Sequence, residues 1–574
     1  MSGIEAAGSG LPVDDTVTAA RAWAAQDPDD GTRGELDILI ATAAAGDHDA
    51  LAELTAMFSS RLAFGTAGLR GELGPGPTRM NRVLVTQAAA GLARFLIDSG
   101  RSRSVVIGYD GRVNSDVFAR DSAAVMAGLG LDVTLLSEAL PTPVLAFAVR
   151  HLDAGAGVMV TASHNPPRDN GYKVYLGQDD AGSQIVPPVD GEIADAIEAV
   201  AAGDIRDLPR SDGFTVQGTE VVDAYVAATA ALVTAPALSP AEQPRVVYTA
   251  MHGVGWATAR QVFTAAGFAE PVTVPEQIEP DGAFPTVAFP NPEEPGAMDL
   301  AIARGLDVGA DLVLANDPDA DRLALAIPSV AADGTAGFRR LSGNEVGWLL
   351  GWRAAERATG ADAAGAAPTL PPATLAASIV SSPALRAVAD RYGLAYRDTL
   401  TGFKWVSRVP GLVFGYEEAL GYLVDPGVVR DKDGISAALD LLSLATELAA
   451  SGRTIADRLQ EFADEFGAYA SGQVATRVDD LARIGDIMAA LRATPPNDLD
   501  GIDVTTVTDF APGVDGFPPS DILRWDLAGG ARVIVRPSGT EPKVKVYIDA
   551  SAGSPGDASA LVERLAAAVR PLVS

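Results

Sequence analysis

The sequence predicts an α/β protein with mixed or parallel sheets, followed by a smaller α+β domain at the C-terminus. Short apolar runs rich in β-branched residues recur along the chain, each followed by a loop rich in Gly, Asp or Asn and by a longer Ala-rich segment with helical spacing. With 574 residues, 48% of them hydrophobic, the chain can form about four domains of roughly 150 residues each. The last hundred residues lack the recurring unit, so we expect another class of domain there.

Four copies of the recurring unit carry polar loops. They are "SVVIGYDGRVNS" (104–115), "GVMVTASHNPP" (157–167), "RVVYTAMHGVG" (245–255) and "DLVLANDPDADR" (311–322). Continuous apolar strands that alternate with helices are typical of parallel sheets covered on both faces. Because ligands bind beyond the carboxyl ends of such strands, we expect the polar loops to form the functional site.

The C-terminal segment and the linkers set the predicted domain boundaries. Two strands, "ARVIVR" and "KVKVYIDA", are expected around the tight loop "PSGTEP", and an amphipathic helix is marked by Leu561, Leu565 and Val569. A Pro/Ala-rich linker is expected at 234–244, with further boundaries near residues 343 and 470. We therefore divide the chain into 1–233, which includes a helical N-terminal extension, 234–343, 344–469 and 470–574.

Charge and composition exclude several classes of function. A formal net charge of −32 argues against nucleic acid or an anionic membrane surface as the main partner. The chain has no cysteine, which excludes disulfides, thiol catalysis and Cys-ligated metal sites. The N-terminal stretch lacks the pattern of an export signal, and prolines interrupt the longest uncharged stretches, 224–241 and 363–385. We therefore expect a cytoplasmic protein.

Three acidic residues in "NDPDADR" predict a metal site. Asp317, Asp319 and Asp321 are spaced two residues apart, and Pro318 disfavours a helix, so an extended backbone turns the carboxylates to one side. A hard divalent cation such as Mg²⁺ relieves their repulsion and leaves room for phosphate or water. An EF-hand is excluded, because its sixth and twelfth positions hold Arg and Pro here. A solvated acidic turn is the alternative.

Ser163 follows another apolar run, in "TASHNP". A triad hydrolase is excluded, because the chain has no Gly-x-Ser-x-Gly elbow and the adjacent His164 is expected to point away from the serine. Two interpretations remain. The stretch is either a turn that satisfies its own backbone groups, with Lys173 as a surface lysine, or the loop of a reactive serine.

Two further loops favour a site for a sugar phosphate. In "VRPSGTEPK", Arg536, Ser538, Thr540 and Lys543 surround Gly539, whose amide can approach an anion closely. "FGYEEALGY" (414–422) offers adjacent carboxylates between glycines, which suits the binding of sugar hydroxyls. Each loop alone is more typical of a hairpin turn or a solvated acidic patch.

A competing class is a dinucleotide-binding oxidoreductase. It is suggested by "VVYTAMHGVGWATA", in which Gly253 and Gly255 follow a predicted strand. The third glycine of that fingerprint is replaced by Thr258, so we interpret the stretch as a packing turn.

Taken in order, these loops resemble those of the α-D-phosphohexomutase superfamily, which includes phosphoglucomutase and phosphomannomutase. The resemblance runs through "FGTAGLRG" (64–71), "TASHNP", "DPDADR", "TGFKW" (401–405), "GYEEALG" and "RPSGTEPK", and covers nearly everything after the first sixty residues. It implies three similar α/β domains and a C-terminal α+β domain around a central cleft. It also implies a monomeric or dimeric isomerase that moves a phosphoryl group between C1 and C6 of a hexose phosphate through a phosphoserine and a sugar bisphosphate. The implied cofactors are Mg²⁺ and a sugar 1,6-bisphosphate activator.

The same resemblance assigns roles to single residues. Ser163 would carry the phosphoryl group against a Mg²⁺ held by that serine and by Asp317, Asp319 and Asp321. Arg70, His164 and Lys173 would surround the reacting centre, with Lys173 in proton transfer. Glu417 would bind sugar hydroxyls, and the residues around Arg536 would bind the phosphate that is not reacting. The full set of implied substrate-binding residues is Arg322, Thr401, Gly402, Lys404, Glu417, Arg536, Ser538, Gly539, Thr540 and Lys543.

Two longer stretches narrow the resemblance to one branch of the superfamily. "HNPPRDNGYKVY" and "GYEEALGYLVDPGVVRDKDG" are similar to the branch that contains phosphopentomutases and glucose-1,6-bisphosphate synthases. Related hexomutases often have a serine two residues after the sugar-binding glutamate, where this chain has Ala419. A phosphopentomutase or a glucose-1,6-bisphosphate synthase is therefore the alternative to a hexose mutase, and a metal-dependent sugar phosphatase is a more remote one.

Overall fold

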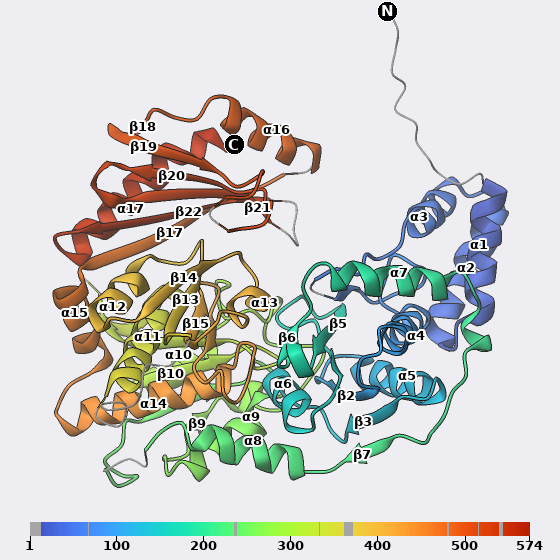
Figure 1. Cartoon of the computed structure of the whole chain (residues 1–574), viewed down its shortest axis with the longest axis horizontal. Coiled ribbons are helices and arrows are strands. Elements are labelled where there is room, and N and C mark those ends of the chain that lie inside the picture. The colour runs from blue at the N-terminus through green and yellow to red at the C-terminus, as the bar shows by residue number, and fades with distance from the viewer. Residues whose placement is uncertain are drawn as a thin grey trace, which may run out of the picture. The chain divides into compact units, whose positions relative to one another are not determined.

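The computed structural model describes residues 13–66, 68–234, 238–331, 333–360, 371–478, 481–514, 516–538 and 543–573 (Figure 1). The chain forms two compact units, Met1–Phe338 with Gly427–Leu439, and Arg339–Pro426 with Asp440–Ser574. Four sheets, two mainly in each unit, form the predicted architecture of α/β domains followed by a C-terminal α+β domain.

The first unit contains two mixed sheets. Its helices are α1 (Val13–Gln26), α2 (Asp30–Ala44), α3 (His48–Phe58), α4 (Arg82–Asp98), α5 (Ser115–Gly128), α6 (Thr142–His151), α7 (Val189–Ala201), α8 (Glu220–Ala230), α9 (Gly255–Ala265) and α10 (Asp299–Val308). Its strands are β1 (Leu69–Glu72), β2 (Ser104–Tyr109), β3 (Asp132–Leu136), β4 (Ala156–Val160), β5 (Asp169–Leu176), β6 (Ser183–Gln184), β7 (Thr215–Gln217), β8 (Val246–Thr249), β9 (Val272–Thr273), β10 (Leu312–Asn316), β11 (Leu323–Val330) and β12 (Ala336–Arg340).

The first sheet has the strand order β1-β5-β4-β2-β3-β7, with β6 beside β5. Strands β4, β2, β3 and β7 are parallel, whereas β5 is antiparallel to both of its neighbours β1 and β4. Apolar residues of α4 and α5, such as Leu92 and Phe118, form one buried core with Val105 and Val158 of the sheet. Helix α6 packs against β2 and β4.

The second sheet has the order β12-β11-β10-β8-β9. Strand β8 is parallel to β9 and to β10, and β11 runs antiparallel to β10. The carboxyl ends of β8 and β10 therefore lie side by side, which places the loop after residue 249 next to the acidic loop after residue 316.

The second unit contains one mixed and one antiparallel sheet. Its helices are α11 (Gly343–Thr359), α12 (Ala384–Tyr392), α13 (Phe403–Val406), α14 (Gly434–Ala450, which begins in the first unit), α15 (Ile455–Phe466), α16 (Leu481–Ala493) and α17 (Pro555–Val569). Strands β14 (Ala395–Thr399), β13 (Thr374–Ser378), β15 (Leu412–Glu417) and β16 (Gly421–Leu423) form the mixed sheet in this order. The antiparallel sheet contains β17 (Ala468–Arg477), β22 (Lys543–Ala552), β21 (Arg532–Pro537), β20 (Leu523–Leu527), β19 (Ile502–Asp509) and β18 (Asp498–Leu499).

The predicted C-terminal elements are confirmed. Strands β21 and β22 pair as an antiparallel hairpin, and α17 packs against β17 and β22. On that helix Leu565 and Val569 are fully buried, as the apolar spacing predicts. The centre of the hairpin loop, residues 539–542, lies outside the described residues.

The recurring strand–loop–helix unit is confirmed at two of its four places and wrong at the other two. Helices α5 and α9 follow the loops after β2 and β8, but the loops after β4 and β10 lead into the antiparallel strands β5 and β11. A parallel crossover needs a dozen or more residues, whereas "LALAIPSV" begins immediately after the acidic loop. The loops that contain Ser163 and the three aspartates are thus short connections within mixed sheets.

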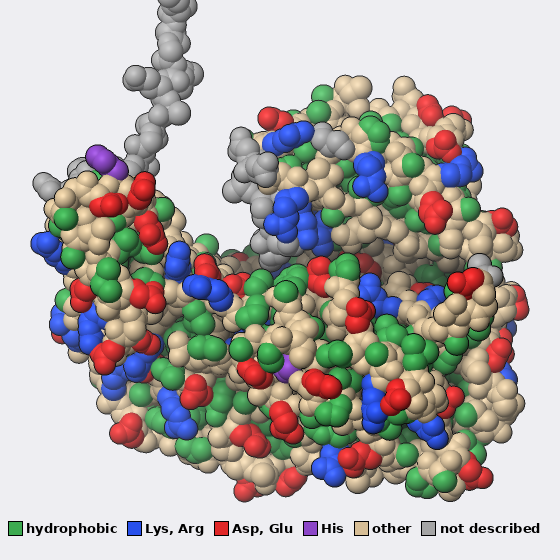
Figure 2. Space-filling view, turned by 180° about the vertical axis from the view of Figure 1, so that it is seen from behind, with side chains coloured by type: hydrophobic (Ala, Val, Ile, Leu, Met, Phe, Trp, Pro, Cys, Tyr) green, Lys and Arg blue, Asp and Glu red, His purple; other side chains and the backbone are tan. Residues whose placement is uncertain are grey.

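In the described part of the chain, no single helix is long and apolar enough to span a membrane. Only together are two consecutive described helices, α14 and α15, long and apolar enough, and a bend of 93° lies between them. Figure 2 shows acidic side chains dispersed among basic and apolar ones on the face it presents, rather than gathered in one patch.

Candidate active site

Ser163 lies in the loop between β4 and β5, with its side chain buried. Its backbone is left-handed (φ 52°), a conformation that non-glycine residues adopt where the surrounding structure imposes it. The hydroxyl donates to Asp317 Oδ2 at 2.9 Å and lies 3.1 Å from His164 Nδ1. The expectation that His164 points away from Ser163 is wrong, because the left-handed backbone brings the two side chains to one side.

The three aspartates of the loop after β10 are completely buried. One carboxylate oxygen from each of Asp317, Asp319 and Asp321 lies within 4.8 Å of the others. Burial, together with the negative charges of Asp319 and Asp321, raises the pKa of Asp317 well above its usual range. The predicted convergence of the three carboxylates is therefore confirmed, and a solvated acidic turn is ruled out.

The oxygens of this cluster fit a hard divalent cation. Asp319 Oδ1 and Asp321 Oδ1 are buried and have no hydrogen-bond partner. A buried acceptor without a partner is costly, and native structures normally satisfy such a group with a donor, a water or an ion. Carboxylate oxygens are the ligands that Mg²⁺ prefers, so the residues present could hold this metal.

Two lysines partly offset the charge of the cluster. Lys173 Nζ, on β5, donates to Asp319 Oδ2 at 2.7 Å and to Asp321 Oδ2 at 2.9 Å. Lys432 Nζ lies 3.0 Å from Asp321 Oδ2. Burial opposes ionisation of Asp321, but the charges of Lys173 and Lys432 hold the pKa of this carboxyl below its usual range.

Lys432 was not predicted as a site residue. The whole chain contains five lysines among its 43 basic residues, namely Lys173, Lys404, Lys432, Lys543 and Lys545. Three of them are predicted site residues, so the scarcity of lysine was a signal that could have identified Lys432.

Arg70 and Arg322 approach the same region from β1 and from the acidic loop. Arg70 Nη1 donates to Asn165 Oδ1 at 3.2 Å. The backbone N–H of Arg322 donates to Asp317 Oδ1 at 3.0 Å, and its guanidinium Nε lies 4.0 Å from that aspartate. Burial, followed by the positive charges of Arg322 and Arg70, lowers the pKa of His164 well below its usual value. The first unit therefore gathers every predicted residue of the reacting centre.

The glycines of "TAMHGVG" pack against the acidic loop. A Cβ on Gly253 would lie 2.3 Å from the backbone of Pro318, and one on Gly255 would lie 3.0 Å from Ala320 Cβ. Val254 N–H donates to the Pro318 carbonyl at 2.9 Å. This geometry agrees with the packing turn that we inferred and accounts for both glycines without a dinucleotide.

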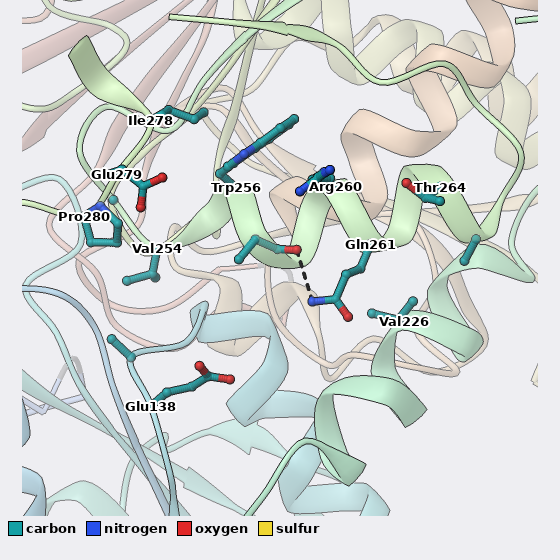
Figure 3. A pocket seen from close by; sticks show the side chains of 14 residues that line it. Glu138, Val226, Val254, Trp256, Arg260, Gln261, Thr264, Ile278, Glu279 and Pro280 are labelled. Atoms are coloured by element: carbon teal, nitrogen blue, oxygen red, sulfur yellow. Dashed lines mark hydrogen bonds between the residues drawn. The ribbon is translucent and has the colours of Figure 1, made fainter. Parts of the chain in front are cut away.

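A groove of about 840 Å³ lies elsewhere, beside α9 (Figure 3). Trp256, Arg260 and Gln261 of this helix line it, together with Glu138 and Glu279 from two loops. Arg260 is paired with Glu270 at 3.0 Å. No residue that we predicted for the site lines this groove, so it adds nothing to the reacting centre.

The second unit brings together four predicted substrate-binding residues. Gly402 N–H donates to Glu417 Oε1 at 2.6 Å. Arg536 Nη1 donates to Thr401 Oγ1 at 2.6 Å. Lys404 follows on the short helix α13.

The described ends of the β21–β22 hairpin hold two further predicted residues. Ser538 N–H donates to the Lys543 carbonyl at 2.8 Å. Gly539 and Thr540 lie outside the described residues.

The adjacent carboxylates of "GYEEALG" have different surroundings. Glu418 Oε2 accepts hydrogen bonds from Ser378 Oγ at 3.1 Å and from Ser381 Oγ at 2.9 Å. Glu417, the last residue of β15, is bonded to Gly402 instead. Glu418 therefore joins its loop to the end of β13 and the turn that follows it, whereas Glu417 joins β15 to the residue before α13.

Fold and site together define an α/β enzyme with a buried serine hydroxyl beside an acidic cluster suited to a divalent metal. Four family models match the chain in order: Phosphoglucomutase/phosphomannomutase alpha/beta/alpha domain I at residues 61–203, domain II at 223–329, domain III at 342–466, and the C-terminal domain at 474–570. The chain therefore belongs to the phosphoglucomutase/phosphomannomutase family, whose members are phosphomutases.

Relatives and structures of known proteins agree with this assignment. The chain is 52% identical over 494 residues to the probable phosphomannomutase of Haemophilus influenzae, with 86% of this chain and 98% of the relative covered. It is 34% identical over 563 residues to human phosphopentomutase, with 91% and 90% covered. A Phosphoglucomutase/phosphomannomutase family protein from Burkholderia thailandensis shares the fold, with a TM-score of 0.66, 20% identity, and 89% and 97% of the two chains covered.

Proposed function

We propose that the chain is a phosphosugar mutase that moves a phosphoryl group between C1 and C6 of a hexose, principally between glucose 1-phosphate and glucose 6-phosphate. The observation that carries the proposal is the hydrogen bond of Ser163 Oγ to Asp317, within a cluster in which one oxygen each of Asp319 and Asp321 is buried and has no hydrogen-bond partner. A serine held against a metal-binding cluster suits the transfer of a phosphoryl group, a reaction in which catalysis is mostly positioning and charge stabilisation.

In this proposal Ser163 carries the phosphoryl group. Mg²⁺, held by Ser163, Asp317, Asp319 and Asp321, would offset negative charge on the phosphoryl oxygens. The bond between Ser163 Oγ and phosphorus breaks as the sugar hydroxyl oxygen forms its own bond to phosphorus. Lys173 is the residue that we assign to proton transfer, because its Nζ reaches this cluster from the strand next to the serine loop. In the neutral amine form it would take up the proton of the attacking hydroxyl, and as the ammonium it would return that proton.

The other predicted residues bind and orient the substrate. Arg70 and His164 are assigned to the reacting phosphate, and Arg322 to phosphate or sugar. Thr401, Gly402, Lys404 and Glu417 are assigned to the sugar, and Arg536, Ser538, Gly539, Thr540 and Lys543 to the distal phosphate. A sugar bisphosphate forms and turns end for end before it returns its other phosphate to the serine, so each phosphate site must accept either end. A sugar 1,6-bisphosphate would act as the primer that first loads the serine.

A pentose phosphate is the second candidate substrate, and a glucose-1,6-bisphosphate synthase activity is a variant of the same chemistry. The hairpin between β15 and β16 holds Ala419, which offers no hydroxyl, and Glu418 is occupied by two serines. A site discriminates strongly when a missing substrate group would leave one of its own polar groups buried and unpaired, and Ala419 creates no such penalty. We therefore infer measurable turnover of mannose or pentose phosphates beside glucose 1-phosphate.

The proposal is tested by measuring kcat/KM for glucose, mannose and ribose 1-phosphates in the presence of a bisphosphate primer, while inorganic phosphate is followed. We expect mutase product without stoichiometric phosphate release. Ala419→Ser should shift the ratio of glucose to ribose phosphate turnover toward glucose by a factor that corresponds to about 0.5 to 1.5 kcal/mol, one neutral hydrogen bond. Release of phosphate at the rate of substrate loss would establish a phosphatase instead.

A further inference from the structure

Arg112 holds the backbone of the serine loop. This residue lies in "YDGR", directly after β2, and 4% of it is exposed. Its Nη2 donates to the carbonyls of Ser163 and Asn165, both at 2.6 Å. Its Nη1 donates to the carbonyls of Pro166 and Asp169, at 2.9 and 3.0 Å. The four terminal N–H groups of one guanidinium are thus matched by four carbonyls of a single loop.

Neighbouring residues fix the plane of this guanidinium. The ring centroid of Phe284 lies 4.9 Å from Arg112 Cζ. Phe284 is buried and has a left-handed backbone (φ 48°), an unusual conformation for a bulky residue. Asp110 Oδ1 accepts the backbone N–H of Arg112 at 3.0 Å and the Ser115 hydroxyl at 2.7 Å, and Asp110 Oδ2 lies 3.6 Å from Arg112 Nε. Phe284 and Asp110 therefore contact the arginine side chain from two different segments of the chain.

The serine loop forms a few hydrogen bonds of its own. Between β4 and β5 it forms two backbone turns, Asn165 N–H to Ala162 O and Asp169 N–H to Pro166 O, both at 3.0 Å. Ser163 N–H also donates to Thr161 Oγ1 at 2.8 Å, and Asn165 Nδ2 donates to Asp169 Oδ2 at 2.9 Å. Ser163 is nevertheless held in a left-handed conformation with its hydroxyl on Asp317. From outside the loop, Arg70 and the Leu73 N–H supply one bond each, to Asn165 and to the Arg168 carbonyl. Arg112 supplies four, and one of these is to the carbonyl of Ser163 itself.

We propose that Arg112 is a positioning residue for phosphoryl transfer, which fixes the loop of residues 163–169 so that Ser163 Oγ stays in line with its metal and its substrate. The inference rests on the proposed role of Ser163 as phosphoryl carrier. Arg112 touches neither the sugar nor the reacting atoms in this proposal, and it acts only through the backbone of the loop.

A lysine cannot replace this arginine. An ammonium group has three donors at one point, whereas the four carbonyls surround a planar fork. Arg112→Lys keeps the buried positive charge but loses the bonds that span the loop. A displacement of about 1 Å at a reacting group can cost on the order of 100-fold in rate. We therefore expect Arg112→Lys to lower kcat by about 100-fold and to leave KM within about threefold.

The first measurement is hydrogen exchange of the full-length protein without substrate. In Arg112→Lys, the loop amides of His164, Asn165, Arg168 and Asp169 should exchange at least tenfold faster than in the wild type, with other segments unchanged. Arg82→Lys is the matched control, because Arg82 also forms two bonds within the first unit, to Asp121 at 2.7 and 2.9 Å, but lies on α4. This control should leave both loop exchange and kcat within about twofold of the wild type.

The second measurement is chemical rescue. In Arg112→Ala, added guanidinium at concentrations that leave the wild type unaffected should restore part of kcat, which loss of general stability would not allow. If both arginine variants fail to fold, Phe284→Leu provides the test, because it removes the ring that contacts the Arg112 guanidinium. We expect it to lower kcat several-fold, to leave KM unchanged and to increase hydrogen exchange in the serine loop.

These outcomes decide between a positioning role and a general structural one. The inference is overturned if the folded Arg112→Lys protein keeps wild-type kcat and loop exchange, if KM changes instead of kcat, or if Arg82→Lys loses as much activity. Retained turnover in Ser163→Ala would overturn the proposed function instead. Hydrogen exchange in the serine loop would still show whether Arg112 orders that loop.

Discussion

Replacing Asp433 by asparagine should make the protein more stable at neutral pH, although the carboxylate is fully hydrogen-bonded. Asp433 is buried, and its Oδ1 accepts the backbone N–H groups of Ile435 and Ser436 at 3.0 Å each. The Tyr225 hydroxyl donates to both carboxylate oxygens at 2.9 Å. Burial outweighs these bonds and raises the pKa of Asp433 from 3.8 to about 6.

The sign and size of the effect follow from this shift. Between pH 3.8 and about 6 the folded state binds more protons than the unfolded state, so this group's contribution to stability falls as pH rises through that window. A shift of about two pKa units corresponds to a loss of about 3 kcal/mol in the free energy of unfolding. About 2 kcal/mol of this loss occurs between pH 4.5 and 8. Asparagine has the same shape as aspartate, and its side-chain oxygen can still accept hydrogen bonds from the two backbone N–H groups, as in a helix N-cap. It carries no charge, so the cost of burying a charge is removed.

The assay is urea unfolding of wild type and Asp433→Asn at pH values from 4.5 to 8. The free-energy difference between the two proteins should change by about 2 kcal/mol in favour of the variant as pH rises, while titration of all other groups cancels. Tyr225→Phe provides the opposite control, because the Tyr225 hydroxyl lowers the pKa of Asp433, and its loss should steepen the fall in stability. A difference that stays constant with pH to within about 0.5 kcal/mol would show that the buried carboxylate is not the cause.

Three further predictions concern the site. Gly253→Ala forces a Cβ to 2.3 Å from the Pro318 backbone, so it should lower the free energy of unfolding by about 1 to 3 kcal/mol and reduce kcat as well, measured by urea unfolding and steady-state kinetics. Lys432→Met removes a cation 3.0 Å from Asp321, so the melting temperature of the variant should fall further below that of the wild type in EDTA than in saturating Mg²⁺. An equal fall in both conditions would contradict this. Arg536→Ala should weaken sugar-phosphate use by tenfold or more, since a charge-assisted hydrogen bond contributes about 1.5 to 3 kcal/mol, and an unchanged kcat/KM would move the distal phosphate site elsewhere.

The features that depend on local pattern were predictable from the sequence. The apolar runs before Asp110, Ser163 and Asp317 are buried strands, because a continuous apolar run fits a strand covered on both faces. The three aspartates converge as their spacing of two predicts. The helices expected after β4 and β10 are wrong, because loop length, which we did not weigh, decides between a parallel crossover and an antiparallel return.

Features that depend on contacts between distant segments were not predictable. Lys432 reaches Asp321 from a segment far along the chain, so its partner was not predictable, although the scarcity of lysine in the chain was a signal that this residue belongs to a site. Glu417 and Glu418 look equivalent in sequence, and the positions of Ser378 and Ser381 separate their roles. The hydrogen bonds of the Arg112 guanidinium to the serine loop go to backbone carbonyls, which every residue carries, so the pattern of side chains does not predict them.

The role of Ser163 as phosphoryl carrier is open to a single measurement. The protein is incubated with glucose 1,6-bisphosphate and its intact mass is recorded beside that of Ser163→Ala, with peptide mapping of the adduct and mutase turnover of both forms. We expect one phosphoryl group on the wild type, mapped to Ser163 and lost on addition of glucose 1-phosphate or glucose 6-phosphate, and neither adduct nor turnover in the alanine variant. Turnover retained by Ser163→Ala, or a phosphoryl group mapped to another residue, would show that the reaction does not pass through this serine.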